Sequence, residues 1–310
     1  MSFSMEVKNE LARLEPHDVN CDKAELLALL RMSGAIVLRG MKIGIHFSTE
    51  NAALARRVLQ LLKNNYQVQT EVLITRSRRL KKNNRYQVQV IPSLQVNKAL
   101  TELQLLSVEG DLKNPLLSSH AARKNYLRGA FLGGGSVSRP NSDYHLELVT
   151  GNEAFAQTII KVMQGFSLKA KLTDRKSDYI VYLKDGESIV KFLNVIGAHN
   201  AMMELENARI IKDMRNNVNR VVNCETANLG KIVKAALRQV NCIKFIESKM
   251  NLNELPESLL FIARLRLQYP EASLNELVDH ADGLGKSGIN HRLKKLQELA
   301  LSLGMEEEKG

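Results

Sequence analysis

The stretches LLALLRMSG at residues 26–34 and LRGAFLGGG at residues 127–135 are two versions of one segment, an apolar run that ends in small residues and glycine. They lie 101 positions apart, and the same offset pairs identical residues further along, such as Asn51 with Asn152. This duplication predicts two similar half-domains that pack against each other, because one small αβ unit cannot bury its apolar face alone.

Both copies predict the same order of elements, αββαββα. In the first copy, helices are expected at 22–32, from Asn51 onward and after Pro92, and strands at 36–38, 43–47, 68–74 and 85–91. In the second, helices are expected at 123–133, from Asn152 onward and at 187–197, and strands at 136–138, 144–150, 168–173 and 178–183. The agreement between two independent patterns supports each of them.

After residue 197 the strand pattern stops, and helical periodicity continues to about residue 250, with breaks expected at Asn216–Asn219 and at 252–256. We therefore expect an α+β region of two pseudo-two-fold repeats, followed by an all-α helix-turn-helix domain. The predicted divisions are an N-terminal helical arm (1–20), a first repeat (21–106), a linker (107–120), a second repeat (121–197), a helical linker (198–225), a helix-turn-helix domain (226–304) and an acidic tail (305–310).

The net charge of the chain is +11, from 44 basic and 33 acidic residues. Between residues 21 and 100, fourteen lysines and arginines stand against four acidic residues, so this segment holds ten of the eleven excess charges. A basic balance of this size favours a polyanionic partner. A merely solubilising surface is the alternative.

The cysteines and the first residues of the chain indicate the cellular compartment in which the protein is expected. Cys21, Cys224 and Cys242 lie far apart without metal-ligand spacing, so neither a disulfide framework nor a zinc site is predicted. The first residues include acids and no continuous apolar run, and no stretch approaches the roughly 18 apolar residues of a membrane span. We expect a cytoplasmic chain with no membrane partner.

Residues 270–300 predict a helix-turn-helix. Ser273 and Glu276 have the spacing of a capping box at the start of a short helix. In the turn that follows, Gly283 and Gly285 are expected at positive φ. Ser287 is expected to cap the second helix, whose apolar residues would face inward. An ordinary helical hairpin with a solvated basic face is the alternative.

The outer face of the second helix supplies side chains suited to duplex DNA. Asparagine and arginine read adenine and guanine through paired hydrogen bonds, and lysine suits phosphates. His291 stands alone, so a phosphate or core contact is a better assignment than a metal ligand. The candidate DNA-binding residues within 273–305 are Ser273, Lys286, Ser287, Gly288, Asn290, His291, Arg292, Lys294 and Lys295.

A basic loop lies between two predicted strands of the first repeat. Its candidate phosphate contacts are Arg76, Arg78, Arg79, Lys81, Lys82 and Arg85. The alternative is an exposed hairpin tip with no role in binding. The corresponding loop of the second repeat, TDRKSD, is balanced in charge, so any nucleic-acid contact should be asymmetric.

The paired motif resembles the LAGLIDADG motif of homing endonucleases, in which two such helices form the central axis and four-stranded saddles straddle DNA. In that family, the acidic residue before the last glycine binds the catalytic divalent metal. Ser33 and Gly134 occupy those positions here. Neither can hold Mg²⁺ as a carboxylate does, so we expect no metal site and no nuclease activity. The alternative is an active divalent-metal-dependent homing endonuclease with relocated acids, or an intron-splicing RNA-binding relative.

Nearly the whole chain resembles the WhiA family of bacterial transcription regulators. The resemblance rests on SFSMEVKNELARL, LRGAFLGGGSV, NCETANLGKIVKAALRQV, LPESLLFIARLRLQYPEASLNEL and GKSGINHRLKKL. It implies a degenerate LAGLIDADG-like region fused to a helix-turn-helix domain. It also implies a role in gene regulation linked to sporulation in filamentous relatives, and to cell division and chromosome segregation in Gram-positive bacteria.

These features and the resemblance predict which partners the protein binds. Double-stranded DNA is the first, which would make the protein nucleoid-associated. RNA polymerase or another transcription regulator is a candidate partner of the duplicated region, where Arg31, Arg39 and Lys42 would face protein. We expect no enzymatic activity, no cofactor and no small-molecule substrate.

Overall fold

The computed structural model describes residues 2–15, 18–39, 42–76, 84–107, 110–281 and 283–306. It divides into two compact units, unit 1 (Met1–Lys212) and unit 2 (Asp213–Gly310). Unit 1 contains two four-stranded sheets with helices, and the described part of unit 2 is helical. The α+β fold class predicted from the sequence is confirmed.

The first repeat has the predicted order of elements. It consists of α2 (Val19–Ser33), β1 (Gly34–Arg39), β2 (Lys42–Thr49), α3 (Ala52–Tyr66), β3 (Thr70–Arg76), β4 (Asn84–Val90) and α4 (Leu94–Glu102). The strands form an antiparallel sheet in the order β1-β2-β4-β3.

The second repeat reproduces this arrangement. It consists of α5 (His120–Gly134), β5 (Gly135–Val137), β6 (Leu146–Thr150), α6 (Glu153–Gln164), β7 (Lys171–Arg175), β8 (Asp178–Leu183) and α7 (Gly186–Ile196), with sheet order β5-β6-β8-β7. The duplicated asparagines are both helix caps, since the side chains of Asn51 and Asn152 accept hydrogen bonds from the first N–H groups of α3 and α6. The predicted order αββαββα is confirmed in both copies.

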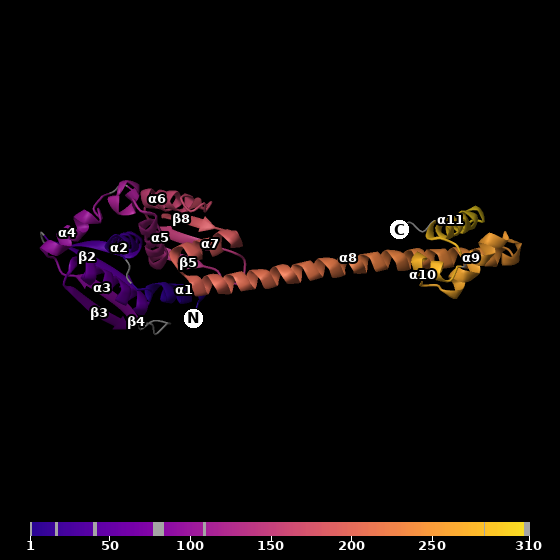
Figure 1. Ribbon diagram of the computed structural model, residues 1–310, viewed down its shortest axis with the longest axis horizontal. Helices are drawn as coiled ribbons and strands as arrows, with labels where there is room; N and C mark the ends of the chain where they lie inside the picture. Colours follow the sequence, from indigo (N-terminus) through magenta and orange to yellow (C-terminus); the bar gives the residue numbers. More distant parts are fainter. Residues whose placement is uncertain are drawn as a thin grey trace. The chain divides into compact units, whose positions relative to one another are not determined.

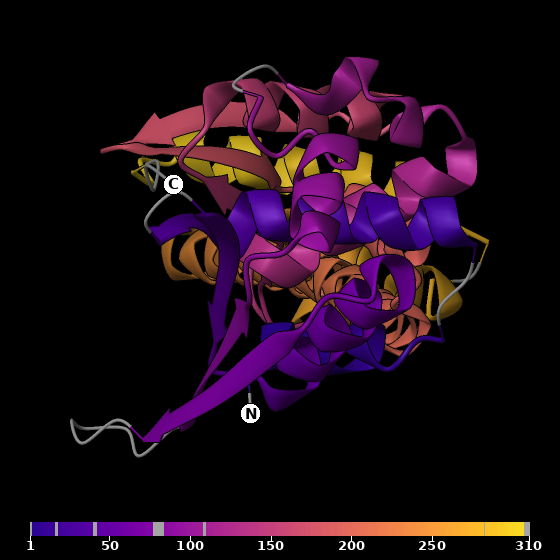
Figure 2. The same ribbon diagram turned by 90° about the vertical axis from the view of Figure 1, so that its left-hand side faces the viewer.

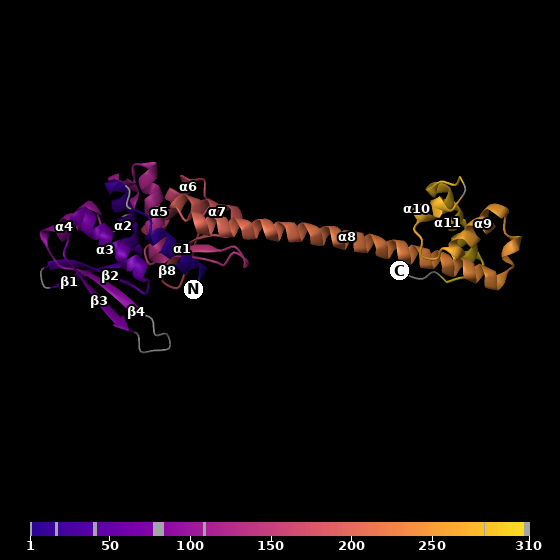
Figure 3. The same cartoon turned by 60° about the horizontal axis from the view of Figure 1, so that its bottom comes forward.

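In each sheet, the described helices pack against one face. In the first repeat α3 and α4 pack on the sheet, as Figure 3 shows. In the second, α5 and α6 do so. Helices α2 and α5 run next to each other between the two sheets (Figures 1 and 2). The central helix pair therefore carries the buried core of unit 1, and the outer face of each sheet is left for other contacts.

The central helices approach so closely that glycine is required at their crossing. A Cβ atom on Gly129 would overlap the main-chain carbonyl oxygen of Glu25, and one on Gly133 would lie 2.5 Å from the Cβ atom of Met32. The hydroxyl of Ser33 donates to the carbonyl of Gly133 at 2.8 Å. Close backbone packing is therefore not confined to the glycines at residues 133–135 and begins one turn earlier, at Gly129.

Beside this crossing lies a buried ion pair. Arg57 of α3 donates from Nε and Nη2 to the two carboxylate oxygens of Glu25, at 2.7 and 2.9 Å, and both side chains are fully buried. Arg128 lies 3.5 Å from the same carboxylate and donates to the carbonyl of Ile196 at 2.7 Å. Burial lowers the pKa of Arg128. One carboxylate from the first repeat thereby links α2, α3 and α5.

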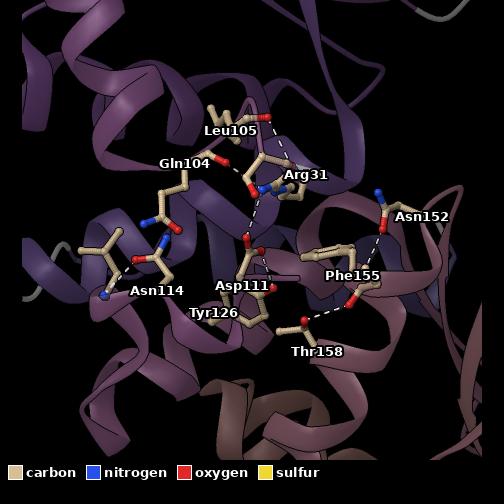
Figure 4. A network of polar contacts seen from close by, with 12 residues as sticks. Arg31, Gln104, Leu105, Asp111, Asn114, Tyr126, Asn152, Phe155 and Thr158 are labelled. Carbon is tan, nitrogen blue, oxygen red and sulfur yellow. Dashed lines mark hydrogen bonds and ion pairs between the residues drawn. The ribbon is translucent and has the colours of Figure 1, made fainter. Parts of the chain in front are cut away.

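A second polar network attaches the segment between the repeats (Figure 4). Arg31 donates to the carbonyl groups of Gln104 and Ser107, each at 2.8 Å, and to the carboxylate of Asp111 at 3.1 Å. The hydroxyl of Tyr126 donates to the other oxygen of that carboxylate at 2.8 Å. Burial raises the pKa of Asp111, although Arg31 and Tyr126 oppose it. The expectation that Arg31 faces a partner is wrong, because its charge is used inside the fold.

The N-terminal arm, α1 (Phe3–Ala12), packs against α3, α5 and β5 of unit 1. Phe3, Val7 and Leu11 are buried. The carboxylate of Glu10 accepts hydrogen bonds from the N–H groups of Asn200 and Ala201, at 2.8 and 3.1 Å. These N–H groups lie in the first turn of α8 (His199–Lys249) and have no acceptor within that helix, so Glu10 satisfies them. An acidic side chain at this end also complements the helix dipole.

Helix α8 continues without interruption through Asn216–Asn219, where the sequence predicted a break. That prediction is wrong because asparagine costs at most about 0.7 kcal/mol in a helix interior and neither proline nor positive φ is present. Residues 211–230 are all exposed. None of the described helices combines the length and apolar character that a membrane crossing needs.

Unit 2 is built on the second half of α8. A short 3₁₀ turn, η3 (Leu252–Glu254), leads to α9 (Glu257–Gln268), α10 (Leu274–Asp279) and α11 (Lys286–Ser302). Ile243 and Ile246 of α8 share a core with Ile262 of α9, Leu277 of α10 and Leu293 of α11. The three short helices are thus fixed around one apolar centre.

Candidate nucleic-acid interface

Helices α10 and α11 form the predicted helix pair. At its start the hydroxyl of Ser273 accepts a hydrogen bond from the N–H of Glu276 at 3.3 Å, and the Glu276 carboxylate accepts from the N–H of Ser273 at 2.7 Å. The predicted capping box is therefore confirmed. These hydrogen bonds lower the pKa of Glu276.

The turn between the helices differs in part from the prediction. Gly283 has φ of +76°, as predicted, and Leu284 packs on the core. Gly285, however, has φ of −72° and is itself the N-cap of α11, without a side-chain hydrogen bond. Ser287 consequently lies inside the first turn of α11, so the prediction that it caps this helix is wrong. Glycine serves at an N-cap almost as well as serine because extended backbone suffices there.

One face of α11 is buried and the other is polar. Ile289, Leu293 and Leu296 are at most 1% exposed, as predicted. Lys286, Ser287, His291, Lys294 and Lys295 are exposed, whereas Gly288, Asn290 and Arg292 are half-buried. His291 is therefore a surface residue and not a core contact. Ser287, His291, Lys294 and Lys295 therefore lie on the solvent side of α11, while Asn290 and Arg292 lie on opposite borders of its buried face.

Two residues that the sequence analysis missed hold the helix pair in place. Arg266, 1% exposed, donates to the carbonyl groups of Tyr269 and Ala272, at 3.2 and 2.6 Å. The ring of Tyr269 stacks on His280, at the end of α10, with centroids 4.2 Å apart. Both contacts fix the connection from α9 into α10. An arginine within the apolar run LLFIARLRL is the only sequence signal for this lock.

A second candidate surface is the outer face of the first sheet. Phe47 and Val88 are buried and opposite each other, so their neighbours along each strand point outward. Arg85 on this face donates from Nε to the hydroxyl of Ser48 at 2.7 Å. The polar residues of this face are His46, Ser48, Glu71, Thr75, Arg85, Gln87 and Gln89. Such side chains can donate to and accept from base edges or phosphates.

The outer face of the second sheet has a different character. Its central acid, Glu147, accepts a hydrogen bond from the hydroxyl of Ser136 at 3.0 Å and lies 3.3 Å from the ring of His145. By the offset of 101, Glu147 corresponds to His46 of the first sheet. The two repeats thus share a fold but present unlike outer surfaces.

Part of the predicted basic loop lies within the described chain. Arg76 and Arg85, at the ends of β3 and β4, are exposed. Arg78, Arg79, Lys81 and Lys82 lie outside the described residues. The expected phosphate contacts therefore begin at the exposed end of the β3–β4 pair.

The positions of the metal-binding acids hold no carboxylate. Ser33 and Gly134 are the last residues of α2 and α5. The Ser33 hydroxyl is engaged by Gly133, and a Cβ atom on Gly134 would lie 2.6 Å from the carbonyl oxygen of Val149. Within the described residues, no three histidine, cysteine, aspartate or glutamate side chains gather closely enough to hold a metal ion.

Three protein-family models match successive parts of the chain. A WhiA N-terminal LAGLIDADG-like domain matches residues 19–106, and a WhiA LAGLIDADG-like domain matches residues 123–215. A WhiA C-terminal HTH domain matches residues 218–300.

The probable cell division protein WhiA of Alkaliphilus metalliredigens is 45% identical over 309 residues, which cover 97% of this chain and 98% of the relative. This chain belongs to the WhiA family. The corresponding protein of Heliobacterium modesticaldum is 46% identical over 306 residues, covering 97% of this chain and 96% of the relative. The family resemblance inferred from the sequence is confirmed.

The crystal structure of full-length DUF199/WhiA from Thermatoga maritima is also similar, with a TM-score of 0.62 and 26% identity over 99% of this chain and all of the other. A structure of an N-terminal LAGLIDADG domain of DUF199/WhiA matches with a TM-score of 0.52 and 25% identity, over 63% of this chain and 90% of the other. The WhiA fold therefore comprises the two repeats, and the helix pair α10–α11 belongs to its C-terminal HTH domain.

Proposed function

We propose that this WhiA-family chain is a sequence-specific transcription regulator that binds double-stranded DNA. Its role would lie in cell division and chromosome segregation, and it would act in the cytoplasm on the nucleoid. Helix α11 would read the sequence from the major groove. The LAGLIDADG-like repeats would be catalytically inactive and would add contacts to DNA or to a protein such as RNA polymerase or another regulator.

The polar face of α11 carries this proposal. A recognition helix needs a buried side that fixes its position and an N-terminal half whose polar side chains reach base edges. Leu293 supplies part of the buried side, and we expect Asn290 and Arg292, half-buried on either border of that side, to reach base edges. Lys294 and Lys295, exposed in the following turn, would contact phosphates.

Selection from a random duplex DNA library tests the role of α11. The full-length protein should enrich one preferred sequence. Asn290→Ala and Arg292→Ala should each relax the preference at one or two positions, by about 1–3 kcal/mol per contact. Glu298→Ala, an exposed change further along α11, is the matched control and should leave the preference unaltered. An identical preferred sequence for wild type and both test variants would exclude base reading by these side chains.

The basic loop is tested by the dependence of affinity on salt. Replacing Arg78, Arg79, Lys81 and Lys82 by glutamine should reduce the slope of log K against log salt by about one for each phosphate that is no longer neutralised. The control is the charge-balanced loop of the second repeat, changed by Arg175→Gln with Lys176→Gln. Equal slopes for the wild type and the four-residue variant would remove the loop from the DNA contacts.

The competing function, a divalent-metal-dependent endonuclease, makes the opposite prediction for cleavage. Duplex and single-stranded DNA and structured RNA are incubated with the protein and Mg²⁺ or Mn²⁺, with and without EDTA. We expect intact nucleic acid throughout, because Ser33 and Gly134 offer no carboxylate. Cleavage that EDTA abolishes and that copurifies with the wild type would replace the proposed function.

A further inference from the structure

The two sheets of unit 1 differ in how their first edge strands are closed. An open strand edge presents unpaired N–H and carbonyl groups, which natural proteins cover or interrupt. In the second repeat the edge strand is β5, and in the first it is β1. The duplication makes them matched positions in one molecule.

The N-terminal arm covers β5. The hydroxyl of Ser4 donates to the carbonyl of Val137 at 2.8 Å and accepts from the N–H of the same residue at 2.9 Å. One serine thus satisfies both main-chain groups of an edge residue. The strand itself has only three residues, Gly135–Val137. This edge leaves little room for another chain.

The edge of β1 is open in the described part of the chain. For residues 35–38, the main-chain hydrogen bonds are those of the ladder with β2. Two apolar side chains on the helix-facing side of this strand remain exposed: Ile36 by 42% and Leu38 by 72%. Strand β1 is also twice as long as its counterpart, with six residues against three.

A pocket of about 230 Å³ lies beside this edge. It is lined by Leu30, Arg31, Gly34, Ala35, Ile36, Ile45 and Leu105. Most of these residues are apolar, so the pocket suits a hydrophobic side chain. The Nε–H group of Arg31 is buried and has no hydrogen-bond partner among the described residues, although the rest of its guanidinium is engaged.

We propose that the β1 edge is a docking site for an extended segment of another protein. The segment would add a fifth strand to the first sheet and place one large apolar side chain in the pocket. Strand addition obtains affinity from main-chain hydrogen bonds and specificity from pockets that take alternate side chains. Ile36 and Leu38 lie two residues apart on one face, which matches this alternation.

Other occupants fit less well. DNA is disfavoured because the exposed side chains of residues 35–38, Ala35, Ile36 and Leu38, are apolar and carry no groups that read bases or bind phosphates. A second copy would have to pair β1 with β1. Six residues span only about 20 Å, too little for the roughly 1,200 Å² that a stable dimer buries. A short segment that binds and releases needs no such area.

Peptide selection against the full-length protein tests the proposal. Random short peptides displayed on phage are panned on the wild type and depleted on Leu38→Glu. Selected peptides should alternate apolar residues and bind Leu38→Glu about tenfold more weakly or worse. Ile74→Glu is the matched control, because Ile74 is 62% exposed on the helix-facing side of β3, the opposite edge of the same sheet. It should bind normally, and both variants should retain DNA binding.

Two further measurements distinguish strand addition from other modes. Bound peptide should slow amide hydrogen exchange in residues 34–38 and leave residues 70–76 unchanged. Peptides N-methylated on alternate residues should divide into one set that loses binding and one that keeps it, since only alternate N–H groups donate across an edge.

Three results would overturn the proposal: no peptide that prefers the wild type to Leu38→Glu, protection outside β1, or equal effects of the two methylation sets. A dimer in solution that Leu38→Glu dissociates would also overturn it, because a second copy would then be the occupant.

Discussion

The hydroxyl of Ser33 donates a hydrogen bond to the main-chain carbonyl of Gly133, so the ends of the two central helices are joined at the place where the resemblance puts catalytic acids. Ser33 ends α2, and Gly134, the neighbour of its partner, ends α5. A group that binds metal in endonucleases thus corresponds here to a contact that holds two repeats together.

Introducing an acid at this position should weaken the fold without creating a metal site. Ser33→Asp replaces a donor by a carboxylate that faces the Gly133 carbonyl, so the free energy of unfolding should fall by about 1–3 kcal/mol. Ser33→Ala, which only removes the donor, should cost about 1 kcal/mol. Urea unfolding is measured with and without Mn²⁺. A midpoint that Mn²⁺ raises in Ser33→Asp would show that a metal site can be restored.

The crossing of α2 and α5 predicts a strong dependence on one glycine. Gly129→Ala would place a methyl group into the Glu25 carbonyl, and rigid backbone on both sides leaves little relief. We expect a loss of stability at or above the upper end of the usual range of about 1–3 kcal/mol. Gly151→Ala, in the same unit with open space around its Cβ position, should change stability by less than about 0.5 kcal/mol. Equal midpoints would mean that the helices can move apart freely.

The buried pair Glu25–Arg57 should show large coupling. Glu25→Gln leaves a buried guanidinium without its counter-charge, and Arg57→Met leaves a buried carboxylate, so each should cost about 3–5 kcal/mol. The double variant should cost less than the sum of the two, because the charge of Arg57 is removed together with its partner and only Arg128 still loses the Glu25 carboxylate. Chemical denaturation of the four proteins completes the cycle. Additive losses would show that the two side chains act independently.

The sequence predicts features that depend on residues close together in the chain and misses those that depend on residues far apart. Repeats, caps and apolar periodicity are local, so the order αββαββα and the Ser273–Glu276 capping box could be foreseen. The backbone approach at Gly129 could not, since it depends on the crossing of helices a hundred residues apart. The same holds for Glu10, which caps a helix 190 positions later. Arg31 looked like surface charge because its partners lie in a connecting segment.

The same distinction between predictable and unpredictable features holds for the candidate site. Polar and apolar positions on α11 follow from helical spacing, whereas its first residue depended on whether Gly285 or Ser287 was the cap. Ser287 was predicted as the cap because serine is a preferred N-cap, but glycine is also acceptable there and Gly285 takes the position. The lock formed by Arg266 was missed because an arginine between leucines carries no indication of which carbonyl groups it will reach.

Lys8 predicts a dependence of stability on pH. It lies in α1 with its Nζ atom 6.0 Å from the ring centre of Phe131, and burial lowers its pKa from 10.5 to about 8. Between these two values the unfolded chain holds a proton that the folded chain has released, so folding becomes more favourable as pH rises through this window. Below pH 8 the folded protein carries the full cost of a poorly solvated charge, at most about 3 kcal/mol.

Lys8→Met should therefore be more stable than the wild type by about 1–3 kcal/mol at pH 7, and the difference should shrink between pH 8 and 10.5 and vanish above. Urea unfolding across this range measures it. Lys169→Met, at an exposed position of the same unit, is the control and should give little difference at any pH. A gain that persists above pH 10.5 would come from apolar packing against Phe131, and a lower stability at pH 7 would mean that the ammonium group is stabilised where it lies.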